Sequence, residues 1–542
     1  MNRATSLDRI RSATDPFDIL IIGGGATGLG AAVDAAARGH RVALIEQHDF
    51  AKGTSSRSTK LVHGGVRYLR QGNISLVLEA LRERGRLTRN APHLVHDLAF
   101  VIPGYKWWEG PFYGIGMKVY DQLAGKLGLQ PSRILSLEET LELIPTVEPE
   151  NLTGGVVYHD GQFDDARLAV NLAQTADELG GAILNYCRCA GLMKEKDIVT
   201  GVLARDGESG EEFTIRAHSV INATGVFVDD IRDLDERGAR RLVAVSQGIH
   251  IVLPKAFLPG KTAIMIPKTA DGRVLFAVPW HDCVVVGTTD TPLPGHSLEP
   301  RALDEEREFV MSHARRYLAK DPSESDVLSI YAGLRPLVKS GDGHNTAALS
   351  RDHTILVSKS GLITVTGGKW TTYRKMAEDV IDQAETVAGV EGTRCHTETM
   401  PIHGWTQSEI RKKNLQPYGS DAVRIAELIK KTPALAQKLH TALPYQQGEV
   451  VWQARHEMAR SVEDVLARRT RALILNARAS IEAAPLVARL LSAELGYDEA
   501  WQTAQVAAYT AVARGYVFTD PASHYAAAPS QGDGKTGEAQ FD

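Results

Sequence analysis

The sequence predicts an α/β protein with a parallel dinucleotide-binding sheet, an antiparallel β domain and an α-helical C-terminal domain. A short apolar run at Phe17–Ile22, typical of a buried parallel strand, leads directly into glycines and an alanine-rich helical pattern at 28–38. Short β-rich runs separated by turn residues occupy about 243–290, as in an antiparallel sheet. Helical patterns dominate after about residue 400.

The length and net charge of the chain limit the kinds of protein that it can be. A chain of 542 residues is long enough for two or more domains. Its 61 basic and 66 acidic residues give a net charge of −5, which argues against a general nucleic-acid binder. No run of 18 apolar residues and no secretory signal is present, so we expect any membrane contact to be peripheral. The cysteines are expected to be reduced, buried thiols and no metal site is expected; they are Cys187, Cys189, Cys283 and Cys395.

The chain divides into segments of different character. Helices are expected at 73–90 and 369–388, a hairpin around Ser360-Gly361, and a clear amphipathic helical pattern at 449–477. The predicted domains are an N-terminal extension (1–16), a discontinuous Rossmann-like dinucleotide-binding domain (17–90, 150–240 and 340–390), a substrate-binding domain (91–149 and 241–339), a helical domain (395–520) and a disordered tail (521–542).

A glycine motif follows the first strand. Gly23-Gly24-Gly25-Ala26-Thr27-Gly28 fits G-x-G-x-x-G, directly after a strand and at the start of a helix. In this motif the first glycine permits the tight turn, the second lets the backbone approach a pyrophosphate, and the third lets helix and strand pack closely. Glu46 ends the second strand, where its carboxylate can bind ribose hydroxyls and would repel a 2′-phosphate.

Two further segments favour FAD over NAD. Ala223-Thr224-Gly225 follows a strand and resembles a segment found in flavoproteins with two dinucleotide-binding motifs. Gly367-Gly368-Lys369 comes before a helix, whose N-terminal amides could serve the electron-rich pyrimidine end of a flavin.

Longer motifs then point to one family. Residues 54–69 (TSSRSTKLVHGGVRYL) resemble the signature of membrane-associated FAD-dependent glycerol-3-phosphate dehydrogenases. So do 163–168 (FDDARL), 287–290 (GTTD), 333–337 (GLRPL) and 367–374 (GGKWTTYR), in family order, and 462–471 resembles the family's C-terminal cap. The resemblance implies an FAD-binding domain of the glutathione-reductase/D-amino-acid-oxidase type.

The resemblance also implies a reaction: sn-glycerol 3-phosphate is oxidised to dihydroxyacetone phosphate by hydride transfer to FAD, and the electrons pass to quinone. A phosphate monoester needs several cations, and the planar fork of arginine suits phosphate oxygens. The implied active site contains Arg67, Tyr68, His250, Arg335, Arg351 and Lys369.

We assign a role to each of these active-site residues as a hypothesis. Arg335 and Arg351 hold the phosphate and Tyr68 donates from its hydroxyl, whereas Arg67 and Lys369 lie near the reacting hydroxyl and the flavin. His250 is the favoured base because a neutral imidazole operates near pH 7, and Lys369 is its rival.

The predicted cofactor contacts come from the same motifs, and His63 is expected mainly to shape the loop beside the flavin. The predicted FAD-binding residues are Gly23, Gly25, Ala26, Thr27, Gly28, Glu46, Thr54, Ser55, Ser56, Thr59, Lys60, Leu61, His63, Gly64, Gly65, Ala223, Thr224, Gly225, Gly367, Gly368, Lys369 and Thr371.

Residues 105–127 interleave aromatic side chains with lysines. This pattern suits a membrane interface, and the family uses the corresponding region for monotopic attachment; the alternative is a core helix under the substrate domain. We expect a protein on the inner face of a bacterial cell membrane, because no D-x-D-x-D-G calcium loop of the kind that mitochondrial members carry is present. The sequence does not set the oligomeric state, and a homodimer is one option.

Three other functions stay open at this point. A glycerol-3-phosphate oxidase would use oxygen and make peroxide, but such enzymes usually carry an insertion in the middle of the chain that we do not find. An amine or amino-acid oxidase does not account for the arginine set or for the run at 60–65. A non-catalytic flavin-binding protein would bind FAD without being reduced by any small phosphate.

Overall fold

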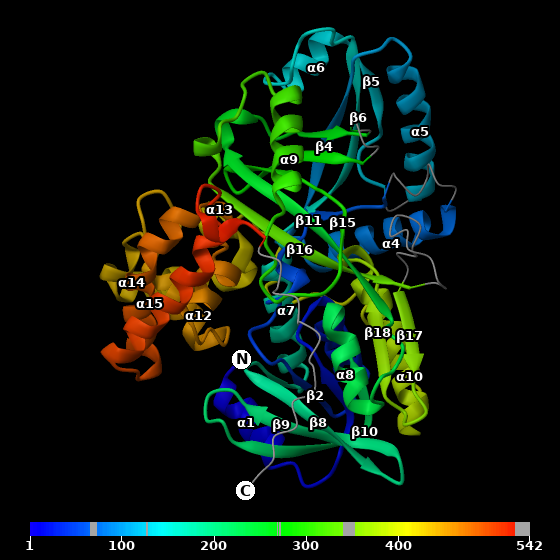
Figure 1. The fold of residues 1–542 in the computed structure, drawn as a ribbon, viewed down its shortest axis with the longest axis vertical. Helices are drawn as coiled ribbons and strands as arrows, with labels where there is room; N and C mark the ends of the chain where they lie inside the picture. The colour runs from blue at the N-terminus through cyan, green and yellow to red at the C-terminus, as the bar shows by residue number, and fades with distance from the viewer. Residues whose placement is uncertain (66–72, 126–127, 268, 270–272, 340–352, 526–542) are drawn as a thin grey trace, which may run out of the picture.

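The computed structural model describes residues 1–65, 73–125, 128–267, 269, 273–339 and 353–525. It has one sheet at each end of the molecule and a group of C-terminal helices at the side (Figure 1). The longer helices are α1 (Arg3–Arg11), α2 (Ala26–Ala37), α4 (Ile74–Asn90), α5 (Glu109–Ala124), α6 (Leu137–Leu143), α7 (Asp165–Glu178), α8 (Val228–Asp235), α9 (Asp304–Tyr317), α10 (Tyr373–Ala388), α11 (Ala422–Lys431), α12 (Gln447–His456), α14 (Ala477–Leu495) and α15 (Glu499–Arg514).

The first sheet is the predicted dinucleotide-binding sheet. Its central strand β1 (Phe17–Ile22) pairs in parallel with its neighbours on both sides, and every residue except Asp18 is buried. Helices α2, α7 and α10 pack on it through an apolar core. The strand order is β17 (His353–Val357), β18 (Ile363–Gly367), β10 (Glu212–Asn222), β1, β2 (Val42–Ile45) and β7 (Ala182–Leu184), and the ribbon β8 (Cys187–Glu195) and β9 (Ile198–Asp206) extends from β10.

The second sheet lies over the first and carries the predicted substrate domain. Its longest strand β11 (Val243–Pro254) pairs antiparallel with three neighbours, as the β-rich pattern predicted. The order is β15 (Thr291–Leu293), β11, β14 (Cys283–Gly287), β13 (Leu275–Trp280), β12 (Ala263–Ile266), β4 (Val95–Gly104), β6 (Gly154–Phe163) and β3 (Leu61–Val62), with β16 (Ser329–Val338) on β11 and β5 (Arg133–Leu135) on β6.

Two details of this sheet differ from the prediction. The sheet is mixed, because β12 and β4 pair in parallel. Strand β6 pairs with β4 along its whole length, so 154–163 belongs to this sheet, although the prediction gave 150–240 to the dinucleotide domain. The error has a physical origin: β6 is buried on both faces, so its sequence has no alternation to distinguish it from a parallel strand.

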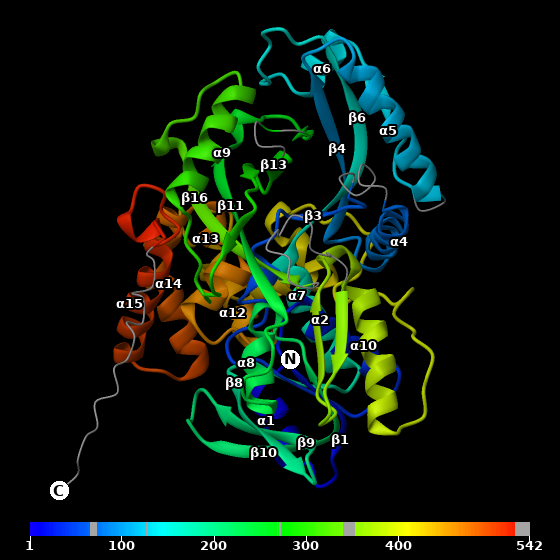
Figure 2. The same ribbon diagram turned by 45° about the vertical axis from the view of Figure 1, so that its right-hand side comes forward.

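The C-terminal helices pack against β11, β14 and β16 of the second sheet (Figure 2). The amphipathic helical pattern at 449–477 corresponds to several short helical segments. The backbone leaves the right-handed helix at Met458 and Arg471, both with positive φ, and α14 begins only at Ala477. Buried ion pairs fix this path, since Arg468 and Arg469 reach Asp49 of the first sheet's domain.

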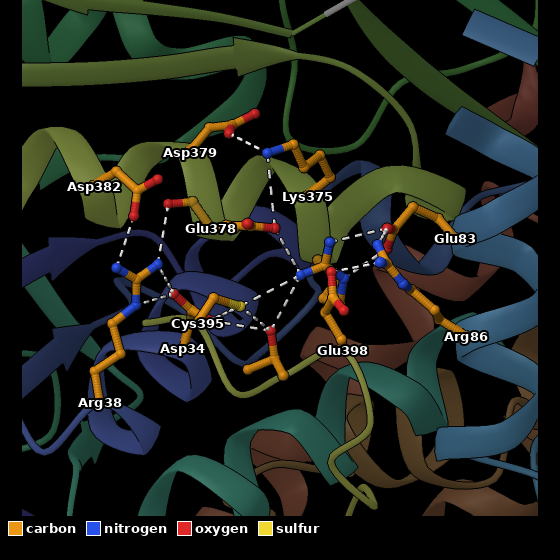
Figure 3. Close-up of polar contacts among 12 residues, drawn as sticks. Asp34, Arg38, Glu83, Arg86, Lys375, Glu378, Asp379, Asp382, Cys395 and Glu398 are labelled. Atoms are coloured by element: carbon orange, nitrogen blue, oxygen red, sulfur yellow. Dashed lines mark hydrogen bonds and ion pairs between the residues drawn. The ribbon is translucent and has the colours of Figure 1, made fainter. Parts of the chain in front are cut away.

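Helix α4 bridges the two sheets through neighbouring charges. Glu83 accepts two hydrogen bonds from Arg374 of α10, at 2.7 and 2.9 Å. Arg84 pairs with Asp160 of β6 at 2.8 Å. Figure 3 shows Glu83 within the wider polar network between α2, α4 and α10, which also includes Asp34 and Cys395. All four cysteines are free.

The first residues of the predicted tail are held by hydrogen bonds. Arg307 of α9 donates to Ser523 Oγ (2.9 Å), and the amide of Tyr525 donates to the carbonyl of Ala302 (2.8 Å). The prediction of a disordered tail is therefore wrong for residues 521–525, and 526–542 lie outside the described residues. Within the described ranges, no helix is both long and apolar enough to cross a membrane.

Candidate active site

Two cavities meet at Thr54, between the sheets. One, of about 270 Å³, lies over the ends of β1, β2 and β10. The other, of about 310 Å³, lies between η7 (Trp370–Thr372) and the second sheet. Because Thr54 lines both, the two cavities are neighbours.

The first cavity has the features of a dinucleotide site. Gly23 has φ of 114°, and a Cβ at this position would lie 2.7 Å from the carbonyl oxygen of Ala223, so the turn requires glycine. Gly25 is the N-cap of α2 and has no side chain, so phosphates can approach the helix N-terminus, where the amide of Ala26 donates to Ser55 Oγ (2.9 Å). The predicted residues that line this cavity are Gly23, Gly25, Ala26, Thr27, Glu46, Thr54, Ser55, Ala223, Thr224 and Gly225.

Glu46 stands where a ribose would bind. Its carboxylate accepts hydrogen bonds from the amides of Gly24 (2.7 Å) and His48 (2.9 Å). Burial raises the pKa of Glu46, while these two amides act in the opposite direction. The glycine turn, the helix N-terminus and this acid together fit the ribose and pyrophosphate of FAD.

Five predicted cofactor residues line neither cavity: Gly28, Ser56, Lys60, Gly64 and Gly367. Gly28 serves packing, because a Cβ there would collide with the carbonyl of Gly23. Lys60 is fully buried, with Nζ 2.7 and 2.8 Å from the two carboxylate oxygens of Asp165. Its ammonium therefore holds the motif loop in place.

The second cavity contains His250. Its imidazole stacks on Tyr331 of the neighbouring strand, with ring centroids 4.8 Å apart. Its Nε2 lies 2.9 Å from Thr59 Oγ1, and no described residue hydrogen-bonds its Nδ1. Burial, with the charges of Arg335 and Lys60, holds the pKa of His250 well below its usual value, so the imidazole is neutral.

Arg335 lies beside His250 on the same sheet. Its Nη2 donates to Thr288 Oγ1 (3.2 Å) and to the carbonyl of Thr289 (3.0 Å), and its Nη1 lies 3.4 Å from Asp290. About a quarter of the side chain stays exposed, which leaves the guanidinium accessible from the cavity. The motif at 287–290 thus orients the predicted phosphate-binding arginine.

The N-terminus of α10 closes the other side of the cavity. Lys369 is the N-cap of η7 and lines the cavity, together with Gly368 and Thr371. The amide of His63 donates to Thr371 Oγ1 (3.2 Å), so the loop at 63–65 lies against this turn. The remaining predicted cofactor residues that line this cavity are Thr59, Leu61, His63 and Gly65.

Three predicted site residues, Arg67, Tyr68 and Arg351, lie outside the described residues. The cavity also contains two cations that the prediction did not include. Arg57 belongs to the 54–69 motif, but its guanidinium is held by Leu298 O (2.6 Å) and Glu299 (2.8 Å). Arg273 lines the cavity from the segment just before β13, and no sequence motif marked it.

Comparisons with known proteins agree with this geometry. A family model described as "FAD dependent oxidoreductase" matches residues 18–374, and "C-terminal domain of alpha-glycerophosphate oxidase" matches 361–502. The mitochondrial glycerol-3-phosphate dehydrogenase of Mesocricetus auratus is 40% identical over 91% of this chain and 72% of the relative. The chain belongs to the FAD-dependent glycerol-3-phosphate dehydrogenase family. The corresponding human protein is 39% identical over 90% of this chain and 71% of that protein.

Solved structures place the fold in the same family. The glycerol-3-phosphate dehydrogenase of Bacillus halodurans, complexed with FAD, is 28% identical, with a TM-score of 0.78 over 95% of this chain and 97% of that chain. An L-α-glycerophosphate oxidase of Mycoplasma pneumoniae is 18% identical, with a TM-score of 0.54 over 69% and 95%, and shows a shared fold alone. The predicted family, fold class, enzyme class and FAD cofactor are therefore confirmed.

Proposed function

We propose that this chain oxidises sn-glycerol 3-phosphate to dihydroxyacetone phosphate on bound FAD and delivers the electrons to a membrane quinone. The observation that carries the proposal is the second cavity, where Arg335, Lys369 and neutral His250 line one space that shares Thr54 with the neighbouring dinucleotide cavity. The bound flavin supplies the hydride acceptor.

The cations suit a small phosphorylated substrate. Arg335 can form a two-pronged contact with phosphate oxygens, and Arg351 and Tyr68 complete the proposed phosphate site. A charge-assisted hydrogen bond contributes roughly 1.5–3 kcal/mol, so loss of Arg335 should weaken substrate binding about 10- to 150-fold. Arg335→Ala should show this loss in the substrate concentration that half-reduces the flavin, with the FAD content unchanged.

His250 is the proposed base, with Lys369 as the rival. The substrate hydroxyl must lose its proton when C2 loses a hydride. The neutral imidazole of His250 can accept that proton at Nε2 when the substrate hydroxyl takes the place of Thr59 Oγ1, which lies 2.9 Å from this nitrogen. Binding of a phosphate dianion beside the ring would raise the pKa of His250 towards neutrality, which strengthens it as a base. Lys369 and Arg67 are proposed to orient the reacting hydroxyl.

Part of the cavity lining is apolar. It contains Phe100, Tyr158, Met265, Val274 and Phe276, which belong to or contact the core beneath α5. An apolar wall beside a flavin suits a lipid-soluble acceptor better than it suits the phosphorylated substrate. This wall supports a quinone as the electron acceptor.

Helix α5 supports contact with a membrane surface. Trp108, Phe112, Ile115 and Val119 share one face, and their exposed fractions are 42, 58, 70 and 41%. Trp107 beside them is 84% exposed, whereas Met117 and Tyr120 on the inner face are buried. An outer face of this composition is typical of an interfacial helix. The alternative, that this segment is a core helix under the substrate domain, accounts only for the buried inner face of α5.

The identity of the electron acceptor distinguishes the proposed dehydrogenase from the oxidase alternative. Purified enzyme in phospholipid vesicles that contain a quinone is given glycerol 3-phosphate, and quinone reduction and hydrogen peroxide are measured in air. We expect quinone reduction with little peroxide. Stoichiometric peroxide with little quinone reduction would establish the oxidase instead. The bacterial inner-membrane location and a homodimer stay predictions.

A further inference from the structure

We propose that Tyr120 is a positioning residue whose hydroxyl fixes the loop at residues 63–65 against the reaction cavity. This inference rests on the proposed function, since it assigns a role in the same site. The predicted FAD-binding set contains His63, Gly64 and Gly65 but nothing that holds them from behind. Tyr120 comes from α5, which is distant in sequence and carries no site motif.

The contact is direct and buried. The amide of Gly64 donates to Tyr120 Oη at 2.8 Å, and Tyr120 Oη donates to Asp160 Oδ2 at 2.7 Å. Arg84 holds the other carboxylate oxygen of Asp160 at 2.8 Å. Tyr120, Asp160 and Arg84 are each at most 2% exposed. One phenol hydroxyl therefore joins the loop to a buried ion pair.

The loop is packed tightly where Tyr120 meets it. A Cβ at Gly64 would lie 2.5 Å from Tyr120 Oη and 2.6 Å from Leu81 of α4, so the backbone lies directly against both helices. His63, Gly65 and Asp160 all line the reaction cavity, whereas Tyr120 stands behind this wall. A change at Tyr120 therefore reaches the cavity through the loop and through Asp160.

A second contact holds the same loop from the opposite side. The amide of His63 donates to Thr371 Oγ1 at 3.2 Å, on the turn that precedes α10. The two attachment points are connected by α4, where Glu83 binds Arg374 of α10 and Arg84 binds Asp160. The loop is thus attached at two points, and α4 connects the elements that hold them.

The protonation state of the phenol suits this role. A hydroxyl that accepts from Gly64 and donates to Asp160 must keep its proton. Burial, and then the negative charge of Asp160, raise the pKa of Tyr120 well above its usual value. Removal of the hydroxyl would leave the Gly64 amide unpaired in a buried place and would loosen the loop. Displacements of about 1 Å in an active site can cost about a hundredfold in rate.

The test is Tyr120→Phe, which keeps the ring and removes the hydroxyl. We expect bound FAD at wild-type stoichiometry, a kcat for glycerol 3-phosphate at least tenfold lower, a KM within threefold of wild type, and a shifted visible flavin spectrum. The matched control is Tyr509→Phe, because Tyr509 is equally buried and donates to Ser480 Oγ (2.7 Å) in the C-terminal helices. It should lose similar thermal stability and keep wild-type kinetics and spectrum.

A second variant changes Arg84, which contacts the same Asp160 carboxylate but does not line the cavity. Arg84→Lys keeps the charge but alters the hold on Asp160, so we expect the same direction of change in kcat. Combined with Tyr120→Phe it should add little further loss, because the two groups act through one carboxylate. If Tyr120→Phe folds poorly, Arg84→Lys alone decides by the same readouts.

The inference is overturned if both variants lose only stability and keep wild-type kcat and flavin spectrum. Failure of the proposed function gives a different result. Wild-type enzyme would then not be reduced by glycerol 3-phosphate, while the flavin spectra and midpoint potentials, measured with redox dyes, would still compare Tyr120→Phe with Tyr509→Phe.

Discussion

At the scale of single residues, glycines make room for the two side chains to which we assign the chemistry. Along β11, Ile249 and Ile251 face the core under α9, so His250 faces the cavity side by strand alternation. Gly287 lies opposite His250, and a Cβ there would collide with the imidazole. A Cβ at Gly248 would collide with the guanidinium of Arg335 in the same way.

The first prediction concerns the base. His250→Asn should retain FAD and slow flavin reduction by glycerol 3-phosphate roughly 10²- to 10⁴-fold, the usual contribution of a general base. Stopped-flow absorbance under anaerobic conditions measures this. His313→Asn, at a buried histidine of α9, is the control and should reduce at the wild-type rate. A wild-type rate in His250→Asn would transfer the role to Lys369.

How much of the site could be predicted differs by residue. The first cavity follows from local sequence, because its glycine turn and Glu46 lie within one strand–helix–strand unit. Lys60 stays a predicted FAD contact, but the sequence could not show that its ammonium pairs with Asp165, because only the tertiary structure brings the two together. Tyr120 and Arg273 could not be found, since each reaches the site from an element whose sequence has no motif.

At the scale of elements, α5 has two faces with different partners. The inner face packs on β6 and contacts α4, and the outer face exposes large apolar side chains. The sequence at 105–127 showed the aromatic residues but not which of them turn outwards. That distinction requires knowing which face the sheet covers.

The outer face should drive vesicle binding. Phe112→Ser together with Ile115→Ser should lower the partition onto vesicles of phosphatidylethanolamine and phosphatidylglycerol at least about tenfold, since a buried large apolar side chain contributes about 1.5–3 kcal/mol. Co-sedimentation measures the partition. Val423→Ser on α11 is the control, because Val423 is also an exposed apolar residue but does not belong to α5. Equal partition of the double variant and wild type would remove α5 as the contact.

Helix α12 carries a buried acid that makes stability depend on pH. Burial raises the pKa of Glu449 to about 7, even though Gln446, Asn414 and Tyr418 hydrogen-bond it. A raised folded-state pKa gives stability that is complete below pH 4.5 and is lost as pH rises to 7, by an amount on the order of 3 kcal/mol.

Glu449→Gln should remove this loss. Between pH 5 and 8 the unfolding temperature of wild type should fall relative to that of Glu449→Gln, and their difference isolates Glu449 because all other groups are shared. Glu427→Gln, at an exposed position of α11, should follow wild type throughout. A constant difference between Glu449→Gln and wild type across this range would contradict the assignment.

At the scale of the whole molecule, buried ion pairs attach the C-terminal helices to the dinucleotide domain. Asp49 accepts from Arg468 Nε (2.5 Å) and from Arg469 Nη2 (2.9 Å), and Arg167 of α7 holds Glu457 at 2.6 and 2.9 Å. The sequence showed a helical pattern here, but the ion pairs decide where the helices break. This is why domain order could be predicted and the path of 457–476 could not.

Loss of the negative charge of Asp49 should lower the stability of the folded protein. Asp49→Asn should lower the free energy of unfolding by about 3–5 kcal/mol, because it leaves two buried guanidinium groups short of their counter-charge. Denaturant unfolding followed by flavin fluorescence measures it. Glu494→Gln breaks a pair with exposed Arg455 and should cost about 1 kcal/mol or less. Equal losses in the two variants would show that the interface does not depend on Asp49.

The central claim is that a flavin and a cation-lined cavity act together on glycerol 3-phosphate. Anaerobic titration of the purified holoenzyme, followed at the visible flavin band, tests it most directly. We predict complete bleaching with glycerol 3-phosphate and none with glycerol at the same concentrations. A flavin that stays oxidised with both, or that bleaches equally with both, would contradict the account.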